Sequence, residues 1–159
     1  MTWPSDVERV AAFLRAAGAE ARIEEHARPT ATAGGAADAV GCTLGQIVKT
    51  LVLLCDDAPL VVLVPGDRRA DTGKVARLAG ARRSAVATAE QVVAVTGWQP
   101  GAVAPFPLPG VHAVLVERTL FRHRTVWTGA GSESHLVALA PTELMRLTHG
   151  RAEDVVLDR

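Results

Sequence analysis

The chain has 159 residues, which is the length of one compact domain. Its 17 basic and 17 acidic side chains give a formal net charge of zero, which excludes a polybasic coat for nucleic acid and an acidic tail. The basic set is lopsided, because Lys49 and Lys74 are the only lysines beside fifteen arginines.

We expect residues 1–159 to form a single domain located in the cytoplasm. The chain does not open on a basic segment followed by an apolar run, which is the pattern of a secretory signal. Its apolar stretches are far shorter than the roughly 20 residues of a membrane span, so no membrane partner is expected. Cys42 and Cys55 lie in no paired pattern, so neither a disulfide framework nor a zinc site is predicted.

Two helices are expected in the first 41 residues. Ser5 with Glu8 three residues later predicts a capping box, followed by a helix with one apolar face that ends at Gly18. The alanine-rich stretch 32–40 predicts a second, short helix closed by Gly41.

A β-hairpin and a helix are expected next. Residues 47–54 and 60–64 are rich in valine and leucine and are separated by a turn-forming segment, which predicts two antiparallel strands. Asp71 or Thr72 then begins a helix that we expect to end at Gly80.

The rest of the chain alternates between helices and strands. Thr88 and Gln91 predict a capping box for a helix ending at Gly97, and residues 98–110 hold too many prolines and glycines for regular structure. Strands are expected over 113–116, 125–128 and 136–139, before a last helix from Pro141 to Gly150. The hairpin argues against a purely parallel sheet, so we predict an α/β (α+β) fold with a mixed, partly closed sheet.

Lys49 is the first candidate for chemistry. It lies in an apolar strand on the same side as Ile47, Leu51 and Leu53, because side chains alternate along a strand. If that side faces inward, the ammonium must be paired, reach water or have a lowered pKa. Such a lysine could bind an anion or stabilise charge on an ester oxygen. The alternative is that Lys49 lies on a rim and extends into solvent.

Two glycine-containing loops are the next candidates. Residues 97–107 combine glycines and prolines into a stiff path whose N–H groups could hold a base or a small side chain, although an ordinary connection has the same composition. In residues 128–135, Gly129 and Gly131 could form an anion-binding nest. A strand follows them instead of a helix, which argues against dinucleotide binding. His135 has either a structural or a binding role.

Basic residues gather in two stretches of the chain. They are Arg68, Arg69, Lys74, Arg77, Arg82 and Arg83 in the first, and Arg118, Arg122, His123 and Arg124 in the second. Such groups are commonly solvated faces, but together they could form a local phosphate-binding surface. The histidines have no metal-ligand spacing and no nucleophile motif is present, so we predict neither a metal nor a cofactor.

Five segments, taken in chain order, together resemble the pattern of a known protein family. They are Thr32-Ala33 through Val40-Gly41, Gly45 through Leu51, Gly66 through Asp71 with Lys74, Gly97-Trp98 through Gly101 to Phe106, and Gly129-Ala130-Gly131 with His135 and Pro141-Thr142-Glu143-Leu144. Together they resemble the YbaK/EbsC family of aminoacyl-tRNA deacylases, which is related to the editing domain of prolyl-tRNA synthetases. The resemblance implies a partly closed, barrel-like sheet surrounded by helices.

The resemblance also implies hydrolysis of the ester that joins a wrong, small amino acid to tRNA. We therefore predict a free-standing trans-editing enzyme that acts on mischarged tRNA, including that for proline, with an aminoacyl-tRNA synthetase as a further candidate partner. The alternative is a binding module that recognises the 3′ end without catalysis. The predicted catalytic residue is Lys49, and the predicted tRNA contacts are Arg68, Arg69 and Lys74. The predicted substrate-binding residues are Thr50, Gly97, Gly101, Ala102, Val103, Pro105, Gly129, Gly131, Ser132 and His135.

Overall fold

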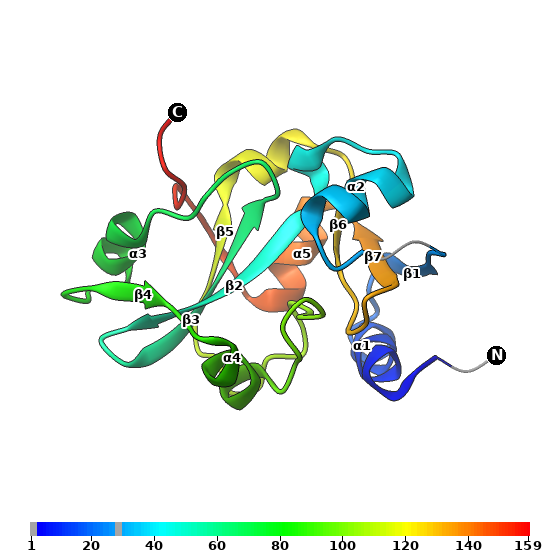
Figure 1. Ribbon diagram of the computed structural model, residues 1–159, viewed down its shortest axis with the longest axis horizontal. Coiled ribbons are helices and arrows are strands. Elements are labelled where there is room, and N and C mark those ends of the chain that lie inside the picture. The colour runs from blue at the N-terminus through cyan, green and yellow to red at the C-terminus, as the bar shows by residue number, and fades with distance from the viewer. Residues whose placement is uncertain (1–2, 28–29) are drawn as a thin grey trace.

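The computed structural model describes residues 3–27 and 30–159, which form two sheets with helices around them (Figure 1). The helices are α1 (Ser5–Ala16), α2 (Ala33–Val40), α3 (Thr72–Ala79), α4 (Ala89–Thr96) and α5 (Pro141–Thr148), with short 3₁₀ helices η1 (Leu44–Gln46) and η2 (Arg118–Arg122). The strands are β1 (Ala21–Glu25), β2 (Val48–Cys55), β3 (Ala58–Pro65), β4 (Ser84–Val86), β5 (Val114–Glu117), β6 (Val126–Gly129), β7 (His135–Leu139) and β8 (Arg151–Glu153).

The strands form a three-stranded sheet, β1-β7-β6, and a five-stranded sheet, β4-β2-β3-β5-β8. The small sheet is antiparallel, whereas β3–β5 and β5–β8 are parallel pairs within the larger one. A single parallel bridge from Ile47 to Trp127 links the start of β2 to β6. The predicted mixed α/β class is therefore confirmed, although the strands are divided between two sheets that meet at this bridge.

Local sequence explains most helix ends, with one correction. Asp71 accepts a hydrogen bond from the N–H of Lys74 at the start of α3, and Thr88 and Gln91 form the predicted capping box of α4. The predicted capping box at Ser5 is wrong, because Pro4 is the N-cap residue and the Glu8 carboxylate pairs with Arg15 instead.

The apolar core lies on both faces of the β2–β3 hairpin. On one face, Val52, Val61 and Leu63 pack in a cluster that also contains Trp98 and Phe106 of the proline-rich segment. On the other face, other β2 and β3 side chains pack with α3 and with the C-terminal residues Val155 and Val156. The second cluster therefore ties the end of the chain to the sheet.

Strands β1, β4 and β8 were not predicted, and the last helix ends earlier than predicted. Thr148 is the final residue of α5, and His149 caps it with a positive φ of 53°. No helix among the described residues is long and apolar enough to cross a membrane.

Candidate active site

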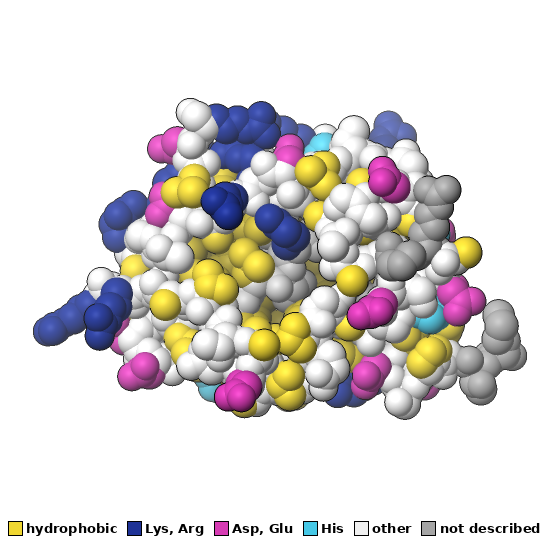
Figure 2. All heavy atoms as spheres, in the orientation of Figure 1, with side chains coloured by type: hydrophobic (Ala, Val, Ile, Leu, Met, Phe, Trp, Pro, Cys, Tyr) yellow, Lys and Arg dark blue, Asp and Glu magenta, His cyan; other side chains and the backbone are white. Residues whose placement is uncertain are grey.

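A cavity of about 220 Å³ lies at the start of β2, between α2, β6 and the loop that follows α4. It is lined by Thr30, Ala31, Thr32, Ala33, Ala36, Ile47, Val48, Lys49, Thr50, Leu51, Gly101, Val103, Trp127, Gly129 and Leu136. The face drawn in Figure 2 has a central hollow lined by hydrophobic side chains, with Lys and Arg side chains at its upper rim. A mostly apolar depression with a few polar groups is the usual form of a small-ligand site.

The cavity lies beside a stretch of one edge of β2 that pairs with no strand in the described part of the chain. Strand β4 pairs only with Leu53–Cys55, whereas β3 runs along the other edge from Val48 to Cys55. The carbonyl of Val52 points to the edge of β2 that faces away from β3, where it accepts a hydrogen bond from the N–H of Ala87. Because backbone groups alternate between the two edges of a strand, Thr50 directs its own N–H and C=O to the same outer edge, beyond the end of β4. The backbone of Thr50 can therefore bind a ligand.

Lys49 is half-buried at the wall of this cavity. Its ammonium donates a hydrogen bond to the carbonyl oxygen of Arg68 at 2.8 Å, its one hydrogen bond in the described part of the chain. An ammonium has three N–H donors, so two remain for a ligand. Burial lowers the pKa of Lys49, and the Arg69 guanidinium lowers it further, while the Asp67 carboxylate opposes both.

Thr50 brings a second polar group to the cavity. Its hydroxyl is buried without a hydrogen-bond partner in the described structure. A buried hydroxyl without a partner has a free-energy cost, so its position at a cavity wall favours a polar group of a ligand as the partner. The Lys49 ammonium and the Thr50 hydroxyl, which extend from opposite faces of β2, therefore both provide hydrogen-bond donors to the wall of the cavity.

The glycine loop approaches the cavity through a close backbone contact. A Cβ atom at Gly129 would lie 2.6 Å from the carbonyl oxygen of Val103, so only glycine allows this approach of β6 and the loop. Gly101 lies in the same loop with a φ of 82°, a conformation that favours glycine. The structure thus brings Gly101, Val103 and Gly129 together with Lys49 and Thr50.

The other predicted substrate-binding residues lie outside the cavity lining. A Cβ at Gly131 would contact Trp98 and the backbone of Asp6, and Gly97 ends α4 beside the Arg9 guanidinium. Ala102 and Pro105 are buried in the loop. Their roles in substrate binding stay predictions.

Ser132 and His135 form a buried group of their own. The Ser132 hydroxyl is hydrogen-bonded to Nδ1 of His135, which is only 2 % exposed. Nε2 of His135 lies 3.3 Å from a Glu25 carboxylate oxygen, and Trp3 packs edge-on against the ring. These contacts connect the turn before β7 with β1 and the start of the chain.

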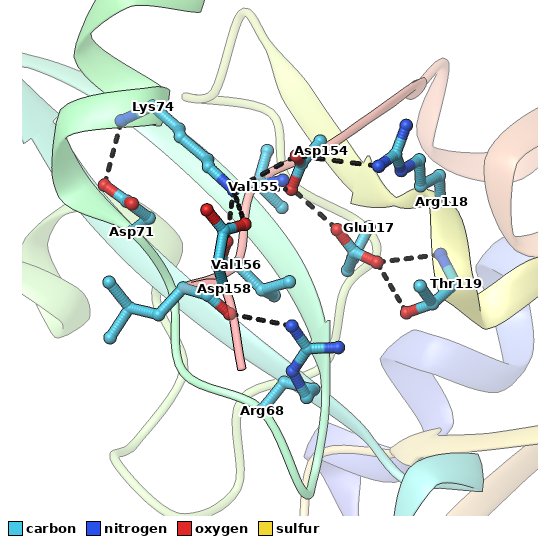
Figure 3. Close-up of polar contacts among 11 residues, drawn as sticks. Arg68, Asp71, Lys74, Glu117, Arg118, Thr119, Asp154, Val155, Val156 and Asp158 are labelled. Carbon is cyan, nitrogen blue, oxygen red and sulfur yellow. Dashed lines mark hydrogen bonds and ion pairs between the residues drawn. The ribbon is translucent and has the colours of Figure 1, made fainter.

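The three residues predicted to contact tRNA occupy different environments. Arg69 is exposed near Lys49, and Arg68 donates a hydrogen bond to the carbonyl of Leu157. The ammonium of Lys74 is held by Asp154, Asp158 and the carbonyl of Val156 (Figure 3). These carboxylates raise the pKa of Lys74. In this geometry Lys74 anchors the end of the chain.

Ten lining residues were not among the predicted site residues. They are Thr30, Ala31, Thr32, Ala33, Ala36, Ile47, Val48, Leu51, Trp127 and Leu136. The first five have small side chains with little chemistry of their own, and the packing of α2 against Ile47 and Trp127 places Ala36 at the cavity. The one available signal was the alanine-rich composition of 32–40, because alanine lets a helix approach its neighbour closely.

Among the described residues, the lining contains no cysteine, histidine or carboxylate. No group of three or more His, Cys, Asp or Glu side chains among the described residues could hold a metal ion. The arrangement can therefore bind and polarise a small polar group through Lys49, Thr50 and backbone N–H groups.

Residues 27–147 match the family model of the aminoacyl-tRNA editing domain. The chain belongs to this family, and the resemblance found in the sequence is confirmed.

Two curated relatives illustrate the range of the family. EbsC of Enterococcus faecalis, whose name proposes it as a Cys-tRNA(Pro)/Cys-tRNA(Cys) deacylase, is 24 % identical over 125 residues, covering 78 % of this chain and 76 % of EbsC. The proline--tRNA ligase of Nitratidesulfovibrio vulgaris (strain DP4) is 38 % identical over 81 residues, covering 51 % of this chain but 14 % of the ligase.

Two crystal structures share the fold over nearly the whole chain. One is of a protein proposed as a trans-editing enzyme for prolyl tRNA synthetase, with 32 % identity and a TM-score of 0.91 over 99 % of this chain and 100 % of that one. The other is the hypothetical protein APE2540, with 33 % identity and a TM-score of 0.88 over 94 % of this chain and 99 % of that one.

Proposed function

We propose that this chain is a free-standing trans-editing deacylase that hydrolyses the ester between a small amino acid and the 3′ end of a mischarged tRNA. The observation that carries the proposal is the cavity beside the free edge of β2, which combines Lys49, the unpartnered Thr50 hydroxyl and the Gly101 loop. Membership of the editing family supplies the reaction class, and residues 1–159 act as one domain.

The size of the cavity supports a small amino acid. Its volume of about 220 Å³ is below the roughly 300–1,000 Å³ of pockets for drug-sized ligands. Trp127, Leu136 and Ile47 form apolar walls that suit a short side chain. The proposed trans-editing role of a structural relative and the matching segments of proline--tRNA ligases support tRNA for proline as a carrier.

Hydrolysis at this site relies on positioning and electrostatics. A water molecule adds to the ester carbonyl, the bond to the ribose oxygen breaks, and the products are the amino acid and a tRNA with free hydroxyls. The ester is already activated, so an oriented nucleophile and a stabilised oxyanion are sufficient. The Lys49 ammonium binds the terminal phosphate or the developing negative charge, and loop N–H groups near Gly101 bind the aminoacyl carbonyl.

A deacylation panel tests this proposal. Alanyl, cysteinyl, seryl and threonyl esters on several tRNAs are incubated with the protein, and release of the amino acid is measured. We expect turnover of at least one small aminoacyl ester. Tight binding of every ester with no turnover would instead support a non-catalytic binding module.

A further inference from the structure

A second, polar hollow of about 560 Å³ lies next to the candidate active site. It is lined by Thr43, Leu44, Gly45, Pro65, Asp67, Arg68, Thr119, Arg122, His123, Asp158 and Arg159. These residues come from the segment before β2, the segment after β3, the η2 region and the end of the chain. We call it the η2 hollow.

The η2 hollow lies next to the cavity, because one chain segment contributes to the walls of both and a hydrogen bond links them. Residues 43–45 line the hollow, and residues 47–51, which begin one residue further along, line the cavity. In addition, the carbonyl of Arg68, a residue of the hollow, accepts the hydrogen bond of the Lys49 ammonium. The hydrogen bond between Lys49 and Arg68 therefore joins the wall of the cavity to the wall of the hollow.

The walls of the η2 hollow are held in place by hydrogen bonds. Gln46 donates to the carbonyl of Thr125 and so ties η1 to the segment after η2. The buried Glu117 carboxylate accepts hydrogen bonds from Thr119 and from the N–H of Val155, as Figure 3 shows. Leu157 donates its N–H to the carbonyl of Arg69. The end of the chain thus forms a fixed wall.

The charges of the η2 hollow favour an anion. The negative charges of its two carboxylates are balanced by ion pairs. The Asp67 carboxylate lies 3.2 Å from the Arg159 guanidinium, and the Asp158 carboxylate lies 2.8 Å from the Lys74 ammonium. By contrast, the side chains of Arg122 and His123 form no hydrogen bond or ion pair within the described residues. Lys and Arg side chains also gather along the upper edge in Figure 2, where η2 runs in Figure 1. Arg122 therefore has free donors that suit a phosphate.

We propose that the η2 hollow binds a backbone phosphate of the single-stranded 3′ end of tRNA, with Arg122 as the main contact and His123 and Arg68 beside it. This assignment rests on the proposed function, because the cavity then holds the aminoacyl group and the preceding nucleotides extend toward the hollow. Phosphate contacts of this kind position the RNA without reading its sequence.

Binding of an unacylated RNA minihelix that ends in a single-stranded CCA tests the proposal. Fluorescence anisotropy gives the Kd at several salt concentrations for wild type, Arg122→Ala and Arg82→Ala. Arg82 is a matched control, since it is an exposed arginine near Asp56 at the turn of the hairpin. The hairpin strands separate that turn from Pro65 and the hollow by about 20 Å.

We expect Arg122→Ala to raise the Kd about threefold to tenfold and to reduce the slope of log Kd against log salt by about 0.7. Arg122→Lys should keep most of the affinity, and Arg82→Ala should change it less than twofold. A blunt minihelix without the CCA end should bind wild type and Arg122→Ala equally.

Two results would overturn the assignment. One is an equal effect of Arg122→Ala and Arg82→Ala, and the other is no binding of the CCA-ended minihelix by wild type at low salt. Because the RNA is unacylated, the result does not depend on deacylation. If the wild-type protein hydrolyses no aminoacyl ester but Arg122→Ala still weakens binding of the minihelix, the proposed function is refuted and phosphate binding in the η2 hollow is supported.

Discussion

Replacing Gly129 by alanine tests how the candidate active site is built. The added Cβ would lie 2.6 Å from the carbonyl oxygen of Val103, so β6 and the loop must separate by roughly 0.4–0.8 Å to reach an ordinary contact. Forcing a methyl group into a packed site typically costs about 1–3 kcal/mol of folding free energy. The same movement displaces the Gly101 loop from Lys49, and misplacement of this order lowers kcat/KM by about tenfold to a hundredfold.

Gly34→Ala is the matched control for this substitution. Gly34 lies on α2, and a Cβ there would meet nothing within 4 Å. Alanine in a helix is more favourable than glycine by about 0.5–1 kcal/mol, so this variant should be at least as stable as wild type and equally active. Urea unfolding and single-turnover deacylation measure both quantities. A Gly129→Ala variant with wild-type stability and wild-type rate would refute the close contact of β6 with the loop.

Three further substitutions probe single interactions. Thr50→Val removes the unpartnered hydroxyl, so the free energy of unfolding should stay constant or rise by up to about 1 kcal/mol while KM increases, as urea unfolding and kinetics would show. Arg69→Ala should raise the pKa of Lys49 without restoring its ordinary value, because burial is the larger cause, and NMR of the lysine Nζ measures it. Because the pKa of Lys49 is lower in the folded state than in the unfolded state, the free energy of unfolding rises with pH between these two values. This rise should be smaller in Arg69→Ala, where the two pKa values of Lys49 lie closer together. Lys74→Met should loosen the end of the chain, and its loss of stability should be full at neutral pH and shrink as the pH falls through the lowered pKa of Asp154. Urea unfolding from about pH 3 to 7 checks this, and a difference that grows in acid would contradict the ion pair.

The long, strongly patterned elements could be predicted from the sequence. The hairpin of β2 and β3, the N-cap of α3 and the capping box of α4 follow from local residues alone. Strands β4 and β8 could not be predicted, because each has only three residues and is mostly exposed, which leaves no clear alternation. The division into two sheets depends on long-range pairing, such as that of β1 with β7, which local sequence does not encode.

The candidate site was predictable where residues have distinctive chemistry. A lysine inside an apolar strand pointed to Lys49, whereas the small residues of 30–33 and Ala36 carry no signal of their own and reach the cavity only through folding. Conversely, Gly131 lies near Gly129 in sequence but packs against Trp98, because the chain reverses direction between β6 and β7. Proximity in sequence therefore does not define which glycines line the cavity.

The two lysines of the chain allow a direct test of the proposed role of Lys49. Lys49→Ala and Lys74→Ala remove the same charge, one at the cavity and the other at the end of the chain. Deacylation of the small aminoacyl ester that wild type turns over is measured for both, with folding checked by circular dichroism. We expect Lys49→Ala to lose turnover at saturating aminoacyl-tRNA and Lys74→Ala to retain it. Wild-type turnover by a folded Lys49→Ala variant would contradict the role of Lys49 and with it the proposed site.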